Sequence, residues 1–193
     1  AKLKYTGVGE SSDRLFEVAA PANFEQAGMG NLNLTRPFSV VTGSGVTITL
    51  LGSSAGTGEI SGAISNGSSS AVSITKEGTG TWTLSAPNMF TGTLTVNNGV
   101  LALTQPNRYG AATAVNGGTL CLTGAAGSVT NTSGITLGSG STLLIDNTAS
   151  DNHGDRVRNA AGLTLNGGTV RFAHTAGAAS YSETLGAVAL SAG

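Results

Sequence analysis

Residues 80–104 read GTWTLSAPNMFTGTLTVNNGVLALT, and hydrophobic residues alternate in this stretch with small polar ones on both sides of a glycine-bearing turn. Successive side chains of a β-strand point to opposite faces, so Leu101 and Leu103 are expected to face one way and Ala102 the other. Asparagine and glycine at the turn tolerate the positive φ of a sharp bend. The stretch therefore predicts two half-buried strands that meet at a corner.

The same strand–turn–strand unit recurs along the chain. The glycines that align at its turn are Gly80, Gly99, Gly118, Gly140 and Gly168. Their separations lie close to the period of roughly 20–29 residues found in solenoid coils, each of which needs a neighbour to bury its apolar face. We therefore predict an all-β fold, a right-handed parallel β-helix (β-solenoid) with coils of roughly 20 residues, as a single continuous segment over residues 1–193.

An antiparallel β-sandwich is the alternative fold. The sequences NNG and NGG are also good signals for a two-stranded hairpin. A sandwich gives no reason for one motif to recur at nearly constant intervals, and hardly any helical periodicity interrupts the chain. The regular spacing therefore favours the β-helix.

The composition narrows the class of protein and its partners. Only 10% of the residues are charged and the formal net charge is −1, with no run of lysine or arginine. Nucleic acids and anionic membranes are therefore not expected as partners. No apolar stretch approaches the roughly 20 residues needed to cross a bilayer as a helix. A single cysteine excludes an internal disulfide framework.

The quoted stretch resembles the passenger-associated transport repeat of bacterial autotransporters, also described as an autotransporter-associated β-strand repeat. The matching features are the GTWTLS strand at 80–85, the NMFTG corner at 88–92 and the pattern V-x-x-G-x-L that follows. Residues 5–18, 155–172 and 182–193 are similar to segments that flank this core in long, repeat-rich secreted proteins. The resemblance implies a β-helical passenger that is secreted or exposed at the bacterial surface, usually as a stalk or an adhesive fibre.

Both ends of the chain read as incomplete motifs, which suggests an assembly site. Joined end to start they give AVALSAG followed by AKLKY, which has the form of another strand–turn–strand unit with Leu190, Leu3 and Tyr5 pointing inward. We expect either a tandem array in one long polypeptide, which the split within a unit favours, or separate chains stacked head to tail in a filament. The residues expected to mediate assembly are Ala1, Lys2, Leu3, Lys4, Tyr5, Val188, Leu190 and Gly193.

The acidic residues are mostly dispersed, which argues against catalysis. The one local cluster is DNHGDR at 151–156, in which Asp151 and Asp155 are weak candidates for a calcium ion and His153 for acid–base chemistry. The competing interpretation is a solvated polar excursion that is hydrogen-bonded to itself, and this interpretation is favoured. No motif for a cofactor is found, and none is expected.

Several single side chains have expected orientations. Trp82 should face the core, although a reversed coil would offer it to a carbohydrate. Met89 and Phe90 lie at a corner where partial exposure would form a sticky ridge. His174 is expected on the core side in a structural role. Cys121 should point outward, either as a free thiol under a loop or as a possible intermolecular contact that joins two fibres through a disulfide.

These observations favour a non-catalytic extracellular structural module that forms a surface fibre, stalk or matrix filament. The first alternative is an adhesin passenger that binds a specific cell-surface or glycan ligand, and the second is a polysaccharide-active enzyme, which would need a groove lined with carboxylates. The expected partners are copies of the same chain stacked head to tail, covalently or non-covalently, with weak glycan contact as a further possibility. The expected location is the bacterial cell surface or the extracellular space.

Overall fold

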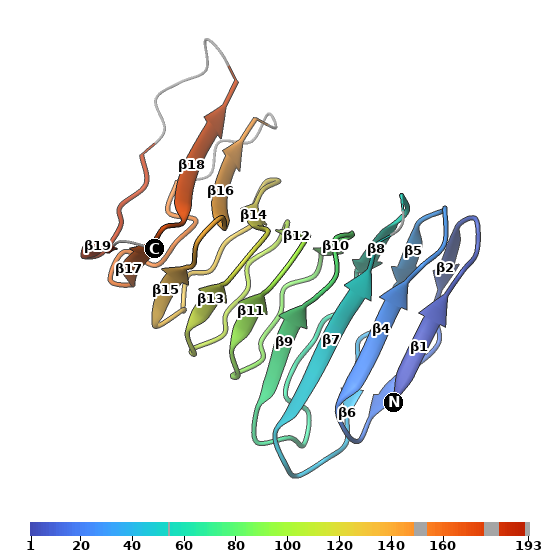
Figure 1. The fold of residues 1–193 in the computed structure, drawn as a ribbon. Helices are drawn as coiled ribbons and strands as arrows, with labels where there is room; N and C mark the ends of the chain where they lie inside the picture. The colour runs from blue at the N-terminus through green and yellow to red at the C-terminus, as the bar shows by residue number, and fades with distance from the viewer. Residues whose placement is uncertain (54, 149–153, 176–181, 192–193) are drawn as a thin grey trace.

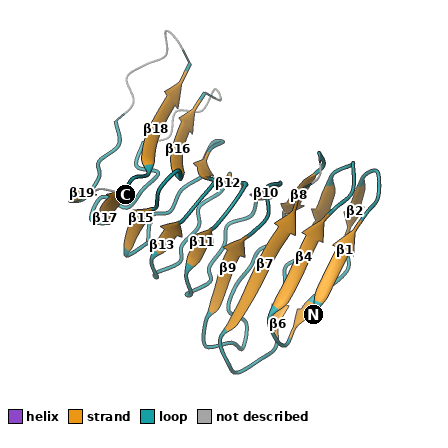
Figure 2. Cartoon of the chain, in the orientation of Figure 1, coloured by secondary structure: helices purple, strands orange, loops and turns teal. Residues whose placement is uncertain are grey.

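The chain folds into a parallel β-solenoid, as predicted. The structure is a computed structural model that describes residues 1–53, 55–148, 154–175 and 182–191, and these contain strands, turns and loops but no α-helix. Every strand pair among them is parallel, and the strands stack in columns along one axis (Figure 1). The colouring by secondary structure shows that short loops separate the strands around each coil (Figure 2). The all-β prediction is therefore confirmed.

Three columns of strands form the sides of the solenoid. Sheet A has nine strands: β1 (Lys2–Tyr5), β4 (Ala22–Gln26), β7 (Val46–Gly52), β9 (Val72–Lys76), β11 (Leu94–Val96), β13 (Thr113–Val115), β15 (Gly134–Leu137), β17 (Gly162–Asn166) and β19 (Val188–Ser191). Sheet B has eight: β2 (Glu10–Ser12), β5 (Leu32–Leu34), β8 (Thr57–Ile60), β10 (Thr81–Leu84), β12 (Val100–Leu103), β14 (Thr119–Leu122), β16 (Thr142–Asn147) and β18 (Thr169–His174). The third side holds β3 (Glu17–Val18), β6 (Ser39–Val40) and single bridges that continue the column.

The coils are longer on average than the sequence predicted, and they vary in length. Thr95 pairs with Ala114 across one of the shortest coils, whereas Thr136 pairs with Thr164 across one of the longest. The average is roughly 24 residues over about seven turns. The motifs that define the predicted period lie mainly in the short coils. Elsewhere the connections on the third side are longer, while the strands of sheets A and B remain in register.

Side chains of one type stack along the inside of sheet B. One inward column contains Leu34, Ile60, Leu84, Leu103, Leu122 and Ile145, each at most 1% exposed. In the adjacent column Trp82 is fully buried between Gly58 and Leu101, and its Nε1 donates a hydrogen bond of 2.8 Å to the carbonyl oxygen of Leu51. A Cβ on Gly58 would clash with the indole, so the glycine makes room for the ring. The inward prediction for Trp82 is confirmed.

The third side is stabilised by stacked polar and aromatic groups. The buried Asn88 donates from Nδ2 to Asn107 Oδ1 at 2.9 Å and accepts from the amide of Ile64 at 2.8 Å. Phe90 is fully buried and stacks on Tyr109 with ring centroids 4.9 Å apart. Phe90 therefore belongs to the core, which corrects the prediction of a partly exposed ridge. Met89, its neighbour at that corner, is exposed, at 66%.

Glycines with positive φ form the corner between sheets A and B. They are Gly78, Gly99, Gly118, Gly140 and Gly167, with φ between 67° and 78°. Three of them are the glycines aligned from the sequence, while Gly78 and Gly167 take the left-handed conformation in place of Gly80 and Gly168. Gly99 is also enclosed, because a Cβ there would clash with the Gly80 oxygen and lie 2.8 Å from Lys76 Nζ. Gly140 has nothing within 4 Å of such an atom.

Replacing Gly99 with alanine is expected to destabilise the fold more than the same change at Gly140. Both substitutions place a side chain at positive φ, which costs about 1–2 kcal/mol. Gly99→Ala adds a steric clash with neighbouring carbonyl oxygens, for a total of about 2–4 kcal/mol. Urea unfolding of the two variants measures the difference. Equal losses of unfolding free energy would show that crowding at this corner is unimportant.

Candidate functional site

No cluster of catalytic or metal-binding side chains is seen in the described part of the chain. Within those residues no three histidine, cysteine, aspartate or glutamate side chains gather closely enough to hold a metal ion. Asp151 and His153 lie outside the described residues, and Asp155 is exposed with a positive φ of 57°. None of the described segments is a helix able to span a membrane. Binding surfaces must therefore be sought on the outer faces and at the ends of the solenoid.

Arg156 corrects the prediction that the DNHGDR segment is wholly solvated. The side chain is fully buried at the corner where sheet B leads into the third side. Its guanidinium donates to Asn147 Oδ1 at 2.8 Å, to the Gly127 oxygen at 2.8 Å and to the Gly124 oxygen at 2.7 Å. A buried guanidinium with these acceptors ties its own coil to the coil before it. The sequence gives no signal for this role, because Arg156 lies outside any alternating strand.

Glu183 holds the following coil against Arg156. Its two carboxylate oxygens accept hydrogen bonds of 2.8 Å from the backbone amides of Arg156 and Val157. Burial raises the pKa of Glu183, although those two amides oppose the change. Asp146, one residue before Asn147, accepts from Thr123 and Thr148. Arg156, Glu183 and Asp146 thus hold neighbouring coils together.

Lys76 is a second buried cation that the sequence analysis missed. It occupies an inward position of β9, where its ladder partners are Leu50 and Val96. Its ammonium donates to the carbonyl oxygens of Glu77 and Gly78, both at 2.7 Å, and of Asn98 at 3.2 Å. Burial lowers its pKa to about 8, an effect that the Glu77 carboxylate opposes. The detectable signal was its place in VSITK, where Val72 and Ile74 mark the inward positions.

Cys121 does not offer an accessible thiol. Its neighbours along the ladder are Ala102 and Leu144, as expected for an outward position, but the residue is only 8% exposed. Burial raises the pKa of the thiol to about 11, and the negative charge of Asp146 adds to this. Cys121 is therefore a covered free thiol at an outward position, as one of the two interpretations expected, and its burial argues against a contact that joins two fibres.

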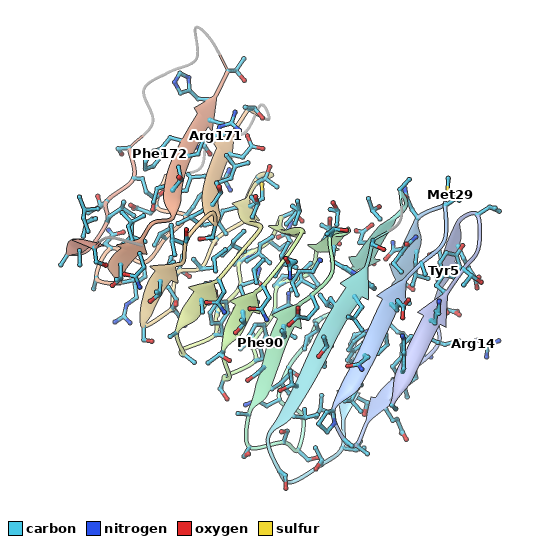
Figure 3. All side chains as sticks on the ribbon, in the orientation of Figure 1. Tyr5, Arg14, Met29, Phe90, Arg171 and Phe172 are labelled. Carbon is cyan, nitrogen blue, oxygen red and sulfur yellow. The ribbon has the colours of Figure 1, made fainter. Side chains whose placement is uncertain are left out.

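Inward positions are exposed at the C-terminal end of the stack. Phe172 continues the column of Ile145 and is 54% exposed, and His174, opposite Asn147, is also exposed. His174 therefore occupies a core-side position without being buried, which corrects the expected environment. The labelled Phe172 and Arg171 lie on β18 at this end (Figure 3). Val188 and Leu190 of β19 are 50% and 78% exposed.

An apolar groove lies at the N-terminal end of the stack. It has a volume of about 220 Å³, and Leu3, Tyr5, Leu32, Leu34 and Phe16 are among its lining residues. Its rim carries Lys4, Glu10, Ser12 and Arg14. Figure 3 shows Tyr5 and Arg14 near this end. Leu3 and Tyr5 therefore point toward the interior, as expected.

The position of the two terminal strands corrects the predicted join between the ends. Both β1 and β19 belong to sheet A. A direct link from Gly193, which lies outside the described residues, to Ala1 would place two sheet A strands in succession with no sheet B strand between them. Suppose instead that β1 of another copy paired with β19 in sheet A. Sheet B would then lack one strand between β18 and the β2 of that copy. The predicted strand–turn–strand unit across the join is therefore wrong, because β1 lies in sheet A.

Comparison with known proteins supports the resemblance seen in the sequence. Residues 74–103 and 98–121 match the model of the passenger-associated-transport-repeat, so the segment that runs from within β9 to β14 is similar to autotransporter passenger repeats. A stretch of 103 residues, 51% of the chain, is 33% identical to the adhesin BmaC autotransporter of Brucella suis biovar 1 (strain 1330). The match spans 3% of the length of that adhesin. No solved structure matches the chain.

Removing the Arg156 side chain is expected to destabilise the protein strongly. Arg156→Leu leaves the Gly124, Gly127 and Asn147 oxygens without their donors. The free energy of unfolding should therefore fall by about 3–5 kcal/mol. Arg158→Leu is the matched control, because Arg158 is exposed two residues away. The free energy of unfolding of Arg158→Leu should stay within about 0.5 kcal/mol of that of the unaltered protein. Chemical denaturation of both variants tests this, and equal stabilities would contradict it.

Lys76 is expected to make the free energy of unfolding depend on pH. The unfolded lysine keeps its proton to about pH 10.4. The folded one loses its proton near pH 8, so the unfolded state binds more protons between these values. The unfolding free energy should therefore rise with pH across this window, by roughly 2 kcal/mol by pH 10 relative to Lys76→Met. Urea unfolding of both proteins at pH 7, 8, 9 and 10 measures the difference in their unfolding free energies. Both proteins contain Cys121 and Tyr109, so the contributions of these two groups cancel in the difference. Parallel pH profiles for the two proteins would contradict it.

Proposed function

We propose that this chain is a non-catalytic spacer of an extracellular autotransporter passenger, built to add length and stiffness to a surface stalk. The observation that carries the proposal is the unbroken stack of nine and eight parallel strands, in which each coil repeats the contacts of the one before. The passenger-associated repeats at 74–121 support an extracellular location. Such a ladder resists extension along its axis because every coil bonds to both neighbours.

The ends of the stack support a continuing solenoid. Leu3 and Tyr5 at one end, and Phe172 and Leu190 at the other, occupy columns that are covered by neighbouring coils everywhere else. The next element after β19 in such an array would be a strand of sheet B that covers β18. In this proposal the seven described assembly residues, Ala1, Lys2, Leu3, Lys4, Tyr5, Val188 and Leu190, contact preceding or following coils.

An adhesin that binds a specific ligand is the second candidate. It is favoured by the 33% identity to a protein named an adhesin. A ligand-binding domain would concentrate its contacts on one patch, whereas a spacer would tolerate the loss of a whole coil. The two candidates therefore differ in their response to a change of length.

Deletion of residues 97–115 tests the spacer proposal. Asn97 and Asn116 occupy the same corner position in successive coils, where Asn116 Nδ2 donates to Asn97 Oδ1 at 2.8 Å, so this deletion removes one complete coil and restores the register. The shortened passenger should fold, reach the surface of intact cells and shorten the stalk by about 4.8 Å. Circular dichroism, antibody labelling of unpermeabilised cells and an adhesion assay of those cells give the readouts.

Deletion of residues 97–105 is the control, because it removes part of a coil and breaks the alternation. It should abolish folding. Loss of adhesion in the folded, surface-exposed 97–115 deletion would favour a specific binding patch in this coil. Labelling that appears only after permeabilisation of the cells would refute the extracellular location.

A further inference from the structure

The outer face of sheet A carries columns of hydroxyl groups. Strand pairing in register from β7 to β17 aligns one column of threonines, which Ala114 alone interrupts, and a shorter second column beside it. We call this surface the threonine face, and it consists of Thr49, Thr75, Thr95, Thr136 and Thr164 in the first column and Thr47, Ser73 and Thr93 in the second. Adjacent strands lie about 4.8 Å apart, which sets the spacing of the hydroxyls along the axis.

The hydroxyls of the first column are available to a ligand. None of the five has a hydrogen-bond partner among the described residues, whereas the interior Thr113 and Thr132 bond to each other at 2.9 Å. All five side chains are half-buried or exposed. Threonine is β-branched and has few rotamers, so the array loses little side-chain entropy when it binds. The face therefore presents donors and acceptors that are already ordered.

The charge of the face selects a neutral ligand. The outward positions of the sheet A strands from β7 to β17 carry no lysine, arginine, aspartate or glutamate, and one carboxylate, Glu77, follows directly after β9. The charged pairs of sheet A, Lys2 and Lys4 with Glu25, lie on β1 and β4. An anionic polymer would find no cationic partner on this surface.

The shape of the face excludes a folded partner. Six strands span about 24 Å along the axis, and two outward residues per strand extend about 7 Å across it, so the area is about 170 Å². A stable protein–protein contact needs about 800 Å² from each partner. A long, narrow strip suits an extended polymer that contacts each coil in turn.

We propose that the threonine face binds a neutral, extended polysaccharide that lies parallel to the solenoid axis. The coil spacing is close to the length of one sugar unit in an extended chain, so successive hydroxyls meet successive sugars. Contacts are individually weak, and the affinity rises with the number of coils engaged. The inference rests on the extracellular location in the proposed function.

Isosteric removal of hydroxyls tests the proposal. The triple variant Thr49→Val, Thr75→Val, Thr95→Val keeps the β-branched shape and removes three hydroxyls from sheet A. The matched control is Thr81→Val, Thr119→Val, Thr142→Val, because these threonines are half-buried on the outer face of sheet B and their hydroxyls also lack hydrogen-bond partners among the described residues. Urea unfolding of both variants confirms that they fold.

Binding is measured by affinity electrophoresis in gels that contain hydroxyethylcellulose or laminarin, with polygalacturonate as the anionic comparison. We expect the unaltered protein to be retarded by a neutral polymer in a manner insensitive to salt. The sheet A variant should bind at least about tenfold more weakly, and the sheet B variant should be unchanged. No retardation by either neutral polymer, or equal losses in both variants, would overturn the proposal.

Salt-sensitive retardation by polygalacturonate alone would also overturn it. The surface labelling of intact cells described above is scored separately. A labelled passenger that binds no neutral polymer refutes the polysaccharide site and leaves the spacer function standing, whereas an unlabelled passenger refutes the spacer's location.

Discussion

The in-register parallel ladder is the constraint on which the rest of the structure depends. Each residue lies about 4.8 Å from the residues at the same position in the coils above and below. Equivalent positions of successive coils therefore lie next to one another, and side chains of the same type pack together along the axis. Apolar side chains gain from this repetition, as the column from Leu34 to Ile145 shows. Charged side chains of one sign would repel their neighbours at this distance, so the ladder accounts for a chain that is only 10% charged and rich in threonine and asparagine.

The two buried cations show how the ladder accommodates charge. Lys76 lies between Leu50 and Val96, so no like charge is adjacent to it in its column. Its partners are backbone carbonyls at the corner, where strands end and oxygens lack ladder donors. Arg156 uses the carbonyls of Gly124 and Gly127 at the next corner. Corners thus provide the free carbonyl acceptors that the strands lack. By binding these carbonyls, each cation holds neighbouring coils together where the repeat is weakest.

Most of the fold could be predicted because the alternation of side chains is local information. Trp82 and Leu101 face inward as their positions require. The errors arose where burial depends on a neighbouring coil. Phe172 and His174 occupy inward columns but are exposed at the outermost strand of sheet B, and Cys121 points outward but is buried. Alternation also does not distinguish sheet A from sheet B, so the placement of AKLKY in the wrong sheet followed from the pattern itself. Arg156 could not be found because its acceptors come from corners far away in the sequence.

A ladder of this kind relates function to length. A pocket needs dissimilar side chains that converge, whereas coils in register place similar side chains in parallel rows. Stiffness and reach then grow with each coil, and so does any weak affinity of an outer face. The threonine face illustrates the point, since one unpaired hydroxyl per coil binds little, whereas the proposed binding of an extended polymer uses five hydroxyls of one column at several places at once. The absence of a hydroxyl at Ala114 removes one contact from that row and leaves the others in place, which explains how a repeat surface tolerates sequence drift that would abolish a convergent site.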